Sequence, residues 1–435
     1  MFRTRQRHDA QRPVTGTPQQ PRNARSTADI PVPTASLTEP GPVPRAEDTS
    51  KAIEWIDSGM ECAASIRGES GKTAAASQVT ASTRAAAHND RLVTPSETAT
   101  AVGSTPILSK DSAMNSNPNA NDTSDVEIAF VGGWGRSGST LLSRMLAEVD
   151  SFVCVGEIRD VFLRGLIENR VCGCGQRFVE CEFWSKVGEE AYGGWDQLSI
   201  PMLEDLRNRT DKPWHVPALM KAGLRKDTDE AVAAYGDILL PLYRAMRTVT
   251  GARVIVDASK IASFGAILNR TEGLSPRFIH LVRDPRGSLH SWMKQIRMED
   301  DPDTTRYMPQ YSVADGAARY VGYNTEMHAV EANSPHMLMK YEDLVVDPEA
   351  QIRKALQTIG VSADSDLSHF IGPEGVKLGV THTVIGNPMR HQSGWIPLRP
   401  DEAWREKMPS RQQKTITALT LPLMKKYGYD IRSSW

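Results

Sequence analysis

Residues 126–149 read VEIAFVGGWGRSGSTLLSRMLAEV, and three patterns follow one another in this stretch. Val126–Val131 is a short apolar run, Gly132–Thr140 (GGWGRSGST) is rich in glycine, and Thr140–Val149 has apolar residues at helical spacing. We therefore predict a strand, a tight turn and a helix in this order. Glycine lets backbone N–H groups turn inward around an anion, and the N-terminus of the following helix adds its dipole. The stretch predicts a phosphate-binding loop.

The alternation of strands and helices continues along the chain. Further strands are predicted at Val153–Glu157, Arg253–Val256, Arg277–Val282 and His336–Lys340. Helices are predicted from Asp284 and Pro285, around Pro348–Ile359, over a long stretch from about Pro213 to Thr250, and at Arg411–Tyr427. Strands separated by helices indicate an α/β fold, with a central parallel sheet and helices on both faces.

Aromatic residues are distributed unevenly. Residues 1–125 contain only Phe2 and Trp55, whereas the rest of the chain holds the other 26 of the 28 aromatic residues. A segment with so little to bury cannot offset the entropy lost on folding. We expect residues 1–123 to be a disordered low-complexity N-terminal extension and residues 124–435 to be one folded domain.

Charge and hydropathy exclude several classes of protein. The net charge is −2, whereas general nucleic-acid binding needs a strongly basic face, so no nucleic-acid partner is expected. No apolar run approaches the length of a membrane span, and the arginines near the N-terminus are not followed by the apolar stretch of a secretory signal. Five cysteines do not make a disulfide scaffold. We expect a cytoplasmic protein without a membrane span.

The glycine-rich loop differs from that of nucleoside triphosphatases. Their pattern is GxxxxGK[ST], and here Gly133 and Gly138 have the required spacing but Ser139 stands where the lysine belongs. The cation lies inside the loop, at Arg136. The missing lysine argues against a kinase that uses ATP and Mg²⁺. A glycine turn with a purely structural role remains an alternative at this point.

A second block, HLVRDPRGSLHSW (residues 280–292), also has the chemistry of a phosphate site. Arg283 is predicted at the carboxyl end of a strand, where open α/β sheets bind ligands. Asp284 suits a helix N-cap, Pro285 suits the first turn, and Ser291 would lie two turns into the helix. Arg283 and Ser291 could then hold a phosphate together. The alternative is a strand end with a surface ion pair and a helix cap.

These blocks carry a resemblance to a known family. GRSGSTLL after an apolar strand resembles the 5′-phosphosulfate loop of sulfotransferases that use 3′-phosphoadenosine 5′-phosphosulfate (PAPS). Residues 280–292 resemble the 3′-phosphate site of that family, and KYEDLVVDP (residues 340–348) resembles its third block. The resemblance implies a P-loop nucleotide-kinase-like sulfotransferase fold. It also implies transfer of a sulfuryl group from PAPS to a hydroxyl or an amine, without a metal.

The resemblance also implies which residues form the donor site. Phosphate contacts come from Arg136, Ser137, Gly138, Ser139 and Thr140, and the 3′-phosphate lies between Arg283 and Ser291. Tyr341 of the third block either contacts the nucleotide or packs. In the loop Thr381–Gly394 the resemblance favours Arg390 as a nucleotide contact, ahead of Asn387 and His382.

The catalytic residues follow from a likeness to protein-tyrosine sulfotransferases, in which a glutamate after the second strand is the base. Carried over, this is Glu157, with Arg136 as the catalytic cation; a helix-terminal acid is the alternative for Glu157. Lys260 follows a strand in VDASK, and the resemblance implies that it contacts the phosphosulfate; a solvated lysine is its alternative. Asp257 is expected to position this loop, and His280 to be a core histidine.

Cys172, Cys174 and Cys181 cluster in RVCGCGQRFVECEFW (residues 170–184). Three thiols would hold zinc only with a fourth ligand, for which Cys154 is a candidate, and C-x-C-x₆-C is not a standard finger spacing. A disulfide is a second alternative. We expect reduced thiols packed in a loop, and no metal site.

The acceptor is not identified by the sequence; a hydroxyl-bearing small molecule, a glycan or a lipid fits the reaction. Two other function classes stay open. A P-loop nucleotide or small-molecule kinase would depend on ATP and Mg²⁺. A non-catalytic nucleotide-binding protein would bind the nucleotide without turnover.

Overall fold

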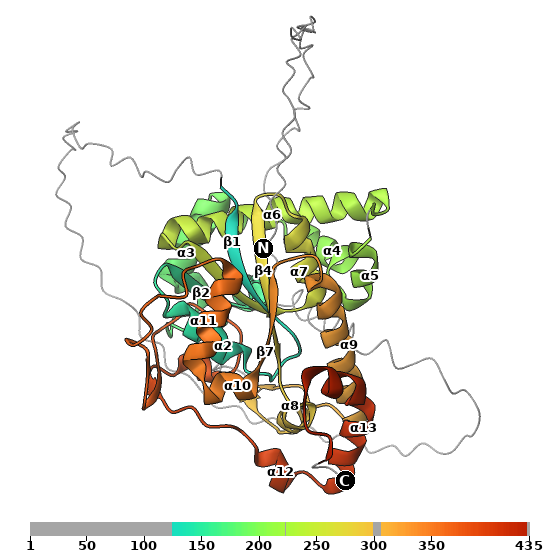
Figure 1. Cartoon of the computed structure of the whole chain (residues 1–435). Coiled ribbons are helices and arrows are strands. Elements are labelled where there is room, and N and C mark those ends of the chain that lie inside the picture. Colours follow the sequence, from blue (N-terminus) through green and yellow to red (C-terminus); the bar gives the residue numbers. More distant parts are fainter. Residues whose placement is uncertain (1–123, 222, 299–305, 433–435) are drawn as a thin grey trace, which may run out of the picture. The chain divides into compact units, whose positions relative to one another are not determined.

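A parallel sheet of five strands lies at the centre of the protein (Figure 1). The computed structural model describes residues 124–221, 223–298 and 306–432. The strands are β1 (Val126–Gly132), β2 (Phe152–Gly156), β3 (Val254–Lys260), β4 (Leu274–Val282) and β7 (His336–Lys340). They lie side by side in the order β2-β3-β1-β4-β7, and every neighbouring pair is parallel. Their carboxyl ends therefore share one edge of the sheet.

Alternate residues of the strands face two separate hydrophobic layers. Ile128 and Phe130 of β1 belong to one core, and Ala129 and Val131 belong to the other. The first core is completed by α3 (Glu182–Tyr192), α4 (Ile200–Thr210), α5 (Val216–Leu219), α6 (Lys226–Thr250) and α7 (Ala262–Arg270). A strand buried on both faces gains apolar burial from each side, which explains why Ile128–Val131 of β1 is continuously apolar.

The opposite face of the sheet packs against a second set of elements. These are α2 (Ser139–Ala147), α10 (Tyr341–Val346), α11 (Pro348–Ile359) and a small antiparallel sheet of β8 (Ile371–Gly372), β9 (Gly375–Leu378) and β10 (Gly394–Ile396). Arg144 of α2 is fully buried, and its guanidinium donates hydrogen bonds to the backbone carbonyls of Gly379, Met389 and Gln392. These bonds fasten the loop between β9 and β10 to α2.

A third hydrophobic cluster includes Val282, the last residue of β4. It is built from α8 (Pro285–Trp292), α9 (Val313–Glu331), α12 (Ala403–Lys407) and α13 (Ser410–Tyr427). Figure 1 shows α13 beside α9 and α12 below α8. The remaining described elements are the pair β5 (Arg297–Met298) and β6 (Arg306–Tyr307), and the short helices η1 (Ile158–Asp160), η2 (Val161–Ile167), η3 (Phe178–Glu180), η4 (Trp195–Gln197), η5 (Pro213–His215) and η6 (Pro388–His391).

The structure confirms the predicted sheet, with helices on both faces, and corrects two element boundaries. The predicted second strand stops at Gly156, whose φ of +86° turns the chain, so Glu157 lies one residue beyond it. The long helical stretch is broken: α5 ends at Leu219 and α6 begins at Lys226, and Gly223 between them has a φ of +79°. A left-handed backbone at this position cannot continue an α-helix.

The proposed disordered extension, residues 1–123, lies outside the described residues. Within the described residues, none of the helices combines the length and hydrophobicity needed to cross a bilayer.

His280 is a core histidine, as predicted, and it belongs to a buried polar group. Its Nε2 lies 2.9 Å from Asn324 Oδ1, and its Nδ1 lies 3.2 Å from Glu331 Oε1. The Nδ1 atom of His328 lies 2.7 Å from the same Glu331 oxygen. Burial disfavours the charged carboxylate, but the hydrogen bonds from both histidines outweigh it and lower the pKa of Glu331 to about 2.

We predict that in Glu331→Gln the free energy of unfolding changes less between pH 7 and pH 3 than it does in the wild type. The unfolded pKa of a glutamate is about 4.3, so the folded-state pairing stabilises the protein above that pH by about 3 kcal/mol and is lost as pH falls towards 2. Urea denaturation between pH 7 and 3 should show the variant less stable at pH 7 and close to wild type at the acid end. Glu190→Gln, at an exposed position, is the control. An unchanged pH slope in Glu331→Gln would contradict this account.

Candidate active site

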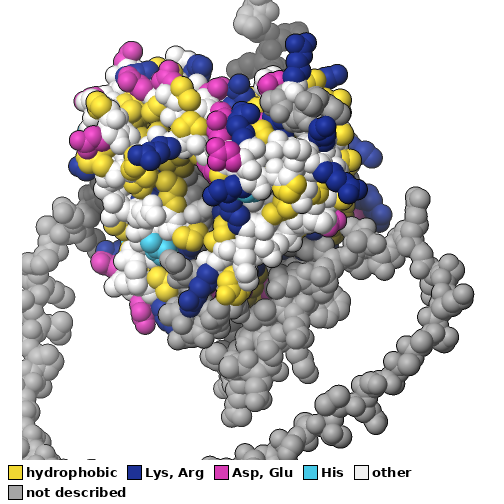
Figure 2. Space-filling view, turned by 90° about the horizontal axis from the view of Figure 1, so that it is seen from below, with side chains coloured by type: hydrophobic (Ala, Val, Ile, Leu, Met, Phe, Trp, Pro, Cys, Tyr) yellow, Lys and Arg dark blue, Asp and Glu magenta, His cyan; other side chains and the backbone are white. Residues whose placement is uncertain are grey.

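The candidate residues follow the carboxyl ends of all five strands. The phosphate loop follows β1, Glu157 follows β2, Lys260 ends β3, Arg283 follows β4 and Tyr341 follows β7. Figure 2 views the molecule from the lower side of Figure 1, where the strands end. Lys and Arg side chains lie there in separate groups among hydrophobic and uncharged ones. The sheet thus gathers at one edge residues that are far apart in the sequence.

The glycine-rich loop makes a tight turn directly before a helix. Arg136 and Gly138 have φ angles of +67° and +95°, and α2 begins at Ser139. Ser137 is buried, and its Oγ has no hydrogen-bond partner among the described residues. A Cβ at Gly138 would lie 2.5 Å from the ring of Tyr341. Glycine is therefore required at this position by conformation and by space.

Arg136 and Arg283 come from two different strand ends and meet. Arg136 Nε donates to Ser291 Oγ at 2.9 Å, and Arg283 Nη1 donates to the Arg136 carbonyl at 3.3 Å. Burial lowers the pKa of Arg136, the charge of Arg283 lowers it further, and Asp401 acts in the opposite direction. Two neighbouring, partly buried guanidinium groups repel each other, so a bound anion would relieve the repulsion.

Arg283 is held from three sides. Its Nη2 lies 3.0 Å from Asp401 Oδ2 and donates to the Asp401 carbonyl at 2.9 Å. Its guanidinium stacks over Tyr341 at 4.6 Å, and its backbone carbonyl accepts from Tyr320 Oη at 2.8 Å. Tyr341 therefore packs between Gly138 and Arg283. Sequence reasoning missed Asp401, because it lies in a loop that carries no pattern of its own.

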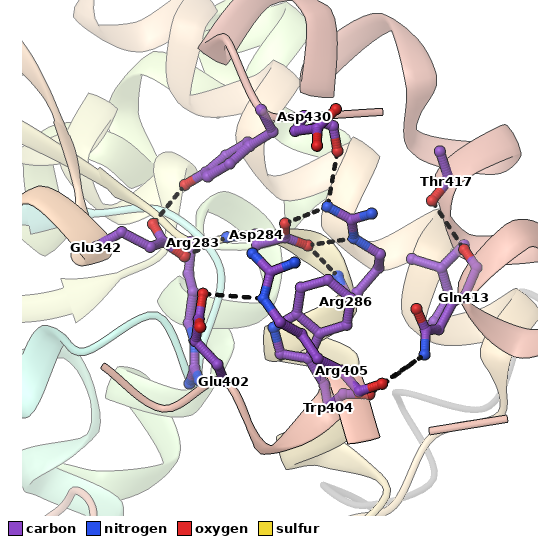
Figure 3. Close-up of polar contacts among 12 residues, drawn as sticks. Arg283, Asp284, Arg286, Glu342, Glu402, Trp404, Arg405, Gln413, Thr417 and Asp430 are labelled. Carbon is purple, nitrogen blue, oxygen red and sulfur yellow. Dashed lines mark hydrogen bonds and ion pairs between the residues drawn. The ribbon is translucent and has the colours of Figure 1, made fainter. Parts of the chain in front are cut away.

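The second arginine of the RDPRG sequence has a structural role (Figure 3). Asp284 caps α8, as predicted, by accepting from the N–H of Arg286 at 2.9 Å. The Arg286 guanidinium returns to the same carboxylate at 2.6 Å and stacks on Trp404. Glu342 accepts from the N–H of Asp284 at 3.0 Å. These contacts fix the backbone that carries Arg283.

Glu157 and Lys260 form an ion pair at the ends of β2 and β3. The Nζ atom of Lys260 lies 2.5 Å from Glu157 Oε1 and donates to the Ala258 carbonyl at 3.0 Å. Both side chains are largely buried but keep an exposed fraction of 15–17%. Lys260 has a φ of +68°, a strained conformation for a residue with a side chain. The strain and the partial burial are typical of functional positions.

Asp257 holds the end of β3, the segment that carries Lys260, through contacts with Tyr243 and Ser259. It is fully buried, accepts from Tyr243 Oη at 2.5 Å and accepts from the N–H of Ser259 at 2.8 Å. Burial is the main cause that raises the pKa of Asp257 to about 6. Ser259 Oγ in turn accepts from the N–H of Arg159 at 3.1 Å. The segment after Glu157 is thus tied to the end of β3.

Sequence reasoning missed a charged network next to Glu157. Arg159 Nε lies 2.7 Å from the buried carboxylate of Asp211, and Asp160 accepts from Arg207 at 2.7 Å. Burial opposes the charge on Arg159, but Asp211 and Asp160 outweigh it and raise the pKa of Arg159. The charged residues of EIRD (residues 157–160) are visible in the sequence. Their partners, Arg207 and Asp211, lie about fifty residues further along the chain, so the sequence alone does not pair them.

The three residues of the loop Thr381–Gly394 that were predicted as candidate nucleotide contacts lie in different surroundings. The N–H of Asn387 lies 3.4 Å from Thr140 Oγ1, beside the phosphate loop. Arg390 is buried and donates to the carbonyls of Val171 at 3.2 Å and Gly386 at 3.4 Å. His382 lies among the cysteines, with its Nδ1 3.3 Å from Cys181 Sγ. Among these three residues, Asn387 is the one whose hydrogen bond to the phosphate loop is described.

The model of the "Sulfotransferase family" matches residues 129–365, more than half of the chain. The chain belongs to the sulfotransferase family. The match includes the phosphate loop, Glu157, Lys260, Arg283 and Tyr341. The predicted family and its P-loop-like fold are thereby confirmed. No curated protein matches this sulfotransferase.

Solved structures of bacterial sulfotransferases are similar to this chain. The sulfotransferase domain of the Synechococcus PCC 7002 olefin synthase has 22% identity and a TM-score of 0.36, over 71% of this chain and 97% of its own. The sulfotransferase domain of the curacin biosynthetic pathway has 17% identity and a TM-score of 0.37, over 70% and 98%. A sulfotransferase from Alicyclobacillus acidocaldarius has 11% identity and a TM-score of 0.31, over 71% and 98%. Family membership rests on the family model and not on these similarities.

We predict that Gly138→Ala destabilises this sulfotransferase more than Gly193→Ala does. Both glycines are left-handed, but a Cβ at Gly193 would meet nothing within 4 Å, whereas one at Gly138 would clash with Tyr341. The backbone strain should lower the free energy of unfolding of both variants by about 1 kcal/mol, and the clash with Tyr341 should lower that of Gly138→Ala by about 1–3 kcal/mol more. Urea denaturation measures both variants. Equal losses would show that Tyr341 does not pack against the loop as described.

Proposed function

We propose that this protein transfers a sulfuryl group from PAPS to a hydroxyl or an amine of its acceptor. The observation that supports this most strongly is the convergence of Arg136, Ser291 and Arg283 at the carboxyl edge of the sheet. Two cations and a hydroxyl suit a ligand with two separate phosphate groups. The Glu157–Lys260 pair at the same edge supplies a base and a cation.

In this proposal the donor binds along the edge of the sheet. The 5′-phosphosulfate lies in the turn Arg136–Thr140, where backbone N–H groups and the start of α2 favour an anion. Ser137, Ser139 and Thr140 contribute hydroxyl groups to it. The 3′-phosphate lies between Arg283 and Ser291 and competes with Asp401 for the Arg283 guanidinium. Tyr341 packs against Arg283, and Arg390 acts by holding the nearby loop.

Transfer needs a base for the acceptor and a cation for the developing charge. We assign the base to Glu157, which takes the proton as the acceptor oxygen or nitrogen attacks sulfur. The bond from sulfur to the bridging phosphate oxygen breaks, and 3′-phosphoadenosine 5′-phosphate (PAP) leaves. Lys260 stabilises the transferred group and the departing phosphate. Arg136 joins Lys260 in this role when its guanidinium leaves Ser291 for the reacting group.

Two rival functions make different predictions. A nucleotide kinase would move phosphate from ATP, and Ser139 in place of the loop lysine counts against it. A non-catalytic protein would bind PAP without turnover, and Glu157 would then have no role beyond binding. The acceptor that we propose is a small molecule, a glycan or a lipid, and the proposed location is the cytoplasm.

We predict that Glu157→Gln lowers transfer by roughly 100-fold or more, because general-base catalysis contributes about 10²–10⁴-fold. The assay follows label from ³⁵S-PAPS into a panel of alcohols, phenols, amines, glycans and lipids. Glu182→Gln, an exposed position on α3, is the matched control and should keep full activity. The proposal fails if no ³⁵S moves to any acceptor while the γ-phosphate of ATP does.

We predict that Arg283→Met weakens PAP binding by about tenfold or more, because it removes a charge-assisted contact to the 3′-phosphate. Binding of adenosine 5′-phosphate, which lacks that group, should change much less. Calorimetry measures both ligands. Arg405→Met, a nearby exposed arginine that stacks on Trp404, is the control. Equal losses for the two nucleotides would refute the 3′-phosphate assignment.

A further inference from the structure

The structure supplies the fourth ligand that the cysteine sequence lacks. The Sγ atoms of Cys172, Cys174 and Cys181 and a ring nitrogen of His382 come together, with every ligand atom within 4.8 Å of the others. Cys181 Sγ lies 3.6 Å from Cys174 Sγ, 3.8 Å from Cys172 Sγ and 3.3 Å from His382 Nδ1. Cys172 Sγ lies 3.7 Å from the same nitrogen. Cys154, the candidate suggested by the sequence, is not part of this group.

The four distances given above are close to those of a tetrahedral zinc site. Zinc binds sulfur at about 2.3 Å and imidazole nitrogen at about 2.0–2.1 Å. The edges of a tetrahedron with these bond lengths are roughly 3.8 Å between two sulfurs and roughly 3.6 Å between sulfur and nitrogen. Three thiolates and one imidazole form a soft donor set that selects zinc over magnesium or calcium. With four protein ligands the site is closed to substrate, as structural zinc sites are.

The surroundings hold the ligands in place. Cys172 and Cys181 are fully buried. The N–H of Cys174 donates to the Cys172 sulfur, and the N–H of Trp184 donates to the Cys181 sulfur. Such N–H donors stabilise negative charge on sulfur, as a thiolate ligand needs. The His382 ring stacks on Phe183 with centroids 4.6 Å apart, which fixes its orientation.

We propose that Cys172, Cys174, Cys181 and His382 bind one structural Zn²⁺. The ligands lose three thiol protons to solvent on binding, and no oxidation is involved. A disulfide would join two of the sulfurs and leave the third cysteine and the histidine without a shared partner. This proposal replaces our sequence-based expectation of packed thiols without a metal. The zinc takes no part in the transfer reaction proposed above.

The ion would join two segments beside the active site. The cysteines lie between η2 and α3, whereas His382 lies in the loop Thr381–Gly394. Next to the ligands, the N–H of Gly173 donates to the Thr383 carbonyl at 2.8 Å. Thr383 packs against Gly156, the residue before Glu157, where a Cβ would lie 3.0 Å away. Zinc would thereby fix the loop that covers the end of β2.

The test measures zinc in the full-length protein, purified from zinc-supplemented cells without chelators. Elemental analysis after gel filtration should find about one zinc per chain. Cys181→Ser and His382→Ala should each hold less than about a tenth of that, since ligand loss strongly weakens closed sites. Cys62→Ser and Cys154→Ser change cysteines outside the ligand set and should keep the zinc. Replacement by Co²⁺ should give thiolate-to-cobalt charge-transfer absorption and the strong visible bands of a tetrahedral site.

The wild-type protein alone can overturn the proposal, so it does not depend on folding of the variants. Folded wild type, judged by circular dichroism, that holds no zinc and whose cysteines all titrate as free thiols would refute it. An intact mass lower by two hydrogens per chain would refute it in favour of a disulfide. Because zinc content is read without donor or acceptor, its failure is distinct from failure of the proposed transfer reaction.

Discussion

The parallel pairing of β1 with β3 is the constraint on which the rest of the site depends. Residue Gly132 is in register with Lys260, and the N–H of Gly133 donates to the Lys260 carbonyl at 3.3 Å. A Cβ at Gly133 would lie 2.4 Å from the Leu281 carbonyl of β4, the other neighbour of β1. The phosphate loop is thus held between Lys260, which pairs with Glu157, and β4, the strand that Arg283 follows. A change in register would separate these groups.

Local patterns predicted the sheet because its central strands, β1, β3 and most of β4, are buried on both faces. Mainly apolar runs marked the strands, and the Asp284–Pro285 pair marked the start of α8 at the correct residue. The ends of elements were predicted less well where glycine decides them. Gly156 ends β2 through its positive φ, and the sequence pattern VCVGE continues past it.

The parts of the site that sequence reasoning missed are long-range pairs of single residues. Asp401 reaches Arg283 across more than a hundred residues, and His382 reaches Cys181 across two hundred. Asp401 lies in no periodic segment or motif, and His382 was considered only as a candidate nucleotide contact, because nothing in the local sequence links it to the cysteines. Asp211 beside Arg159 is a similar case. The roles proposed for Glu157, Lys260 and Arg283 rest on the family resemblance together with the geometry now described.

The most direct test of the account is a crystal structure of the protein with PAP. We expect the 5′-phosphate in the turn Arg136–Thr140 and the 3′-phosphate between Arg283 and Ser291. The Arg283–Asp401 contact should lengthen as the phosphate takes its place. A nucleotide bound away from the carboxyl edge of the sheet, or one whose 3′-phosphate faces solvent, would contradict the account.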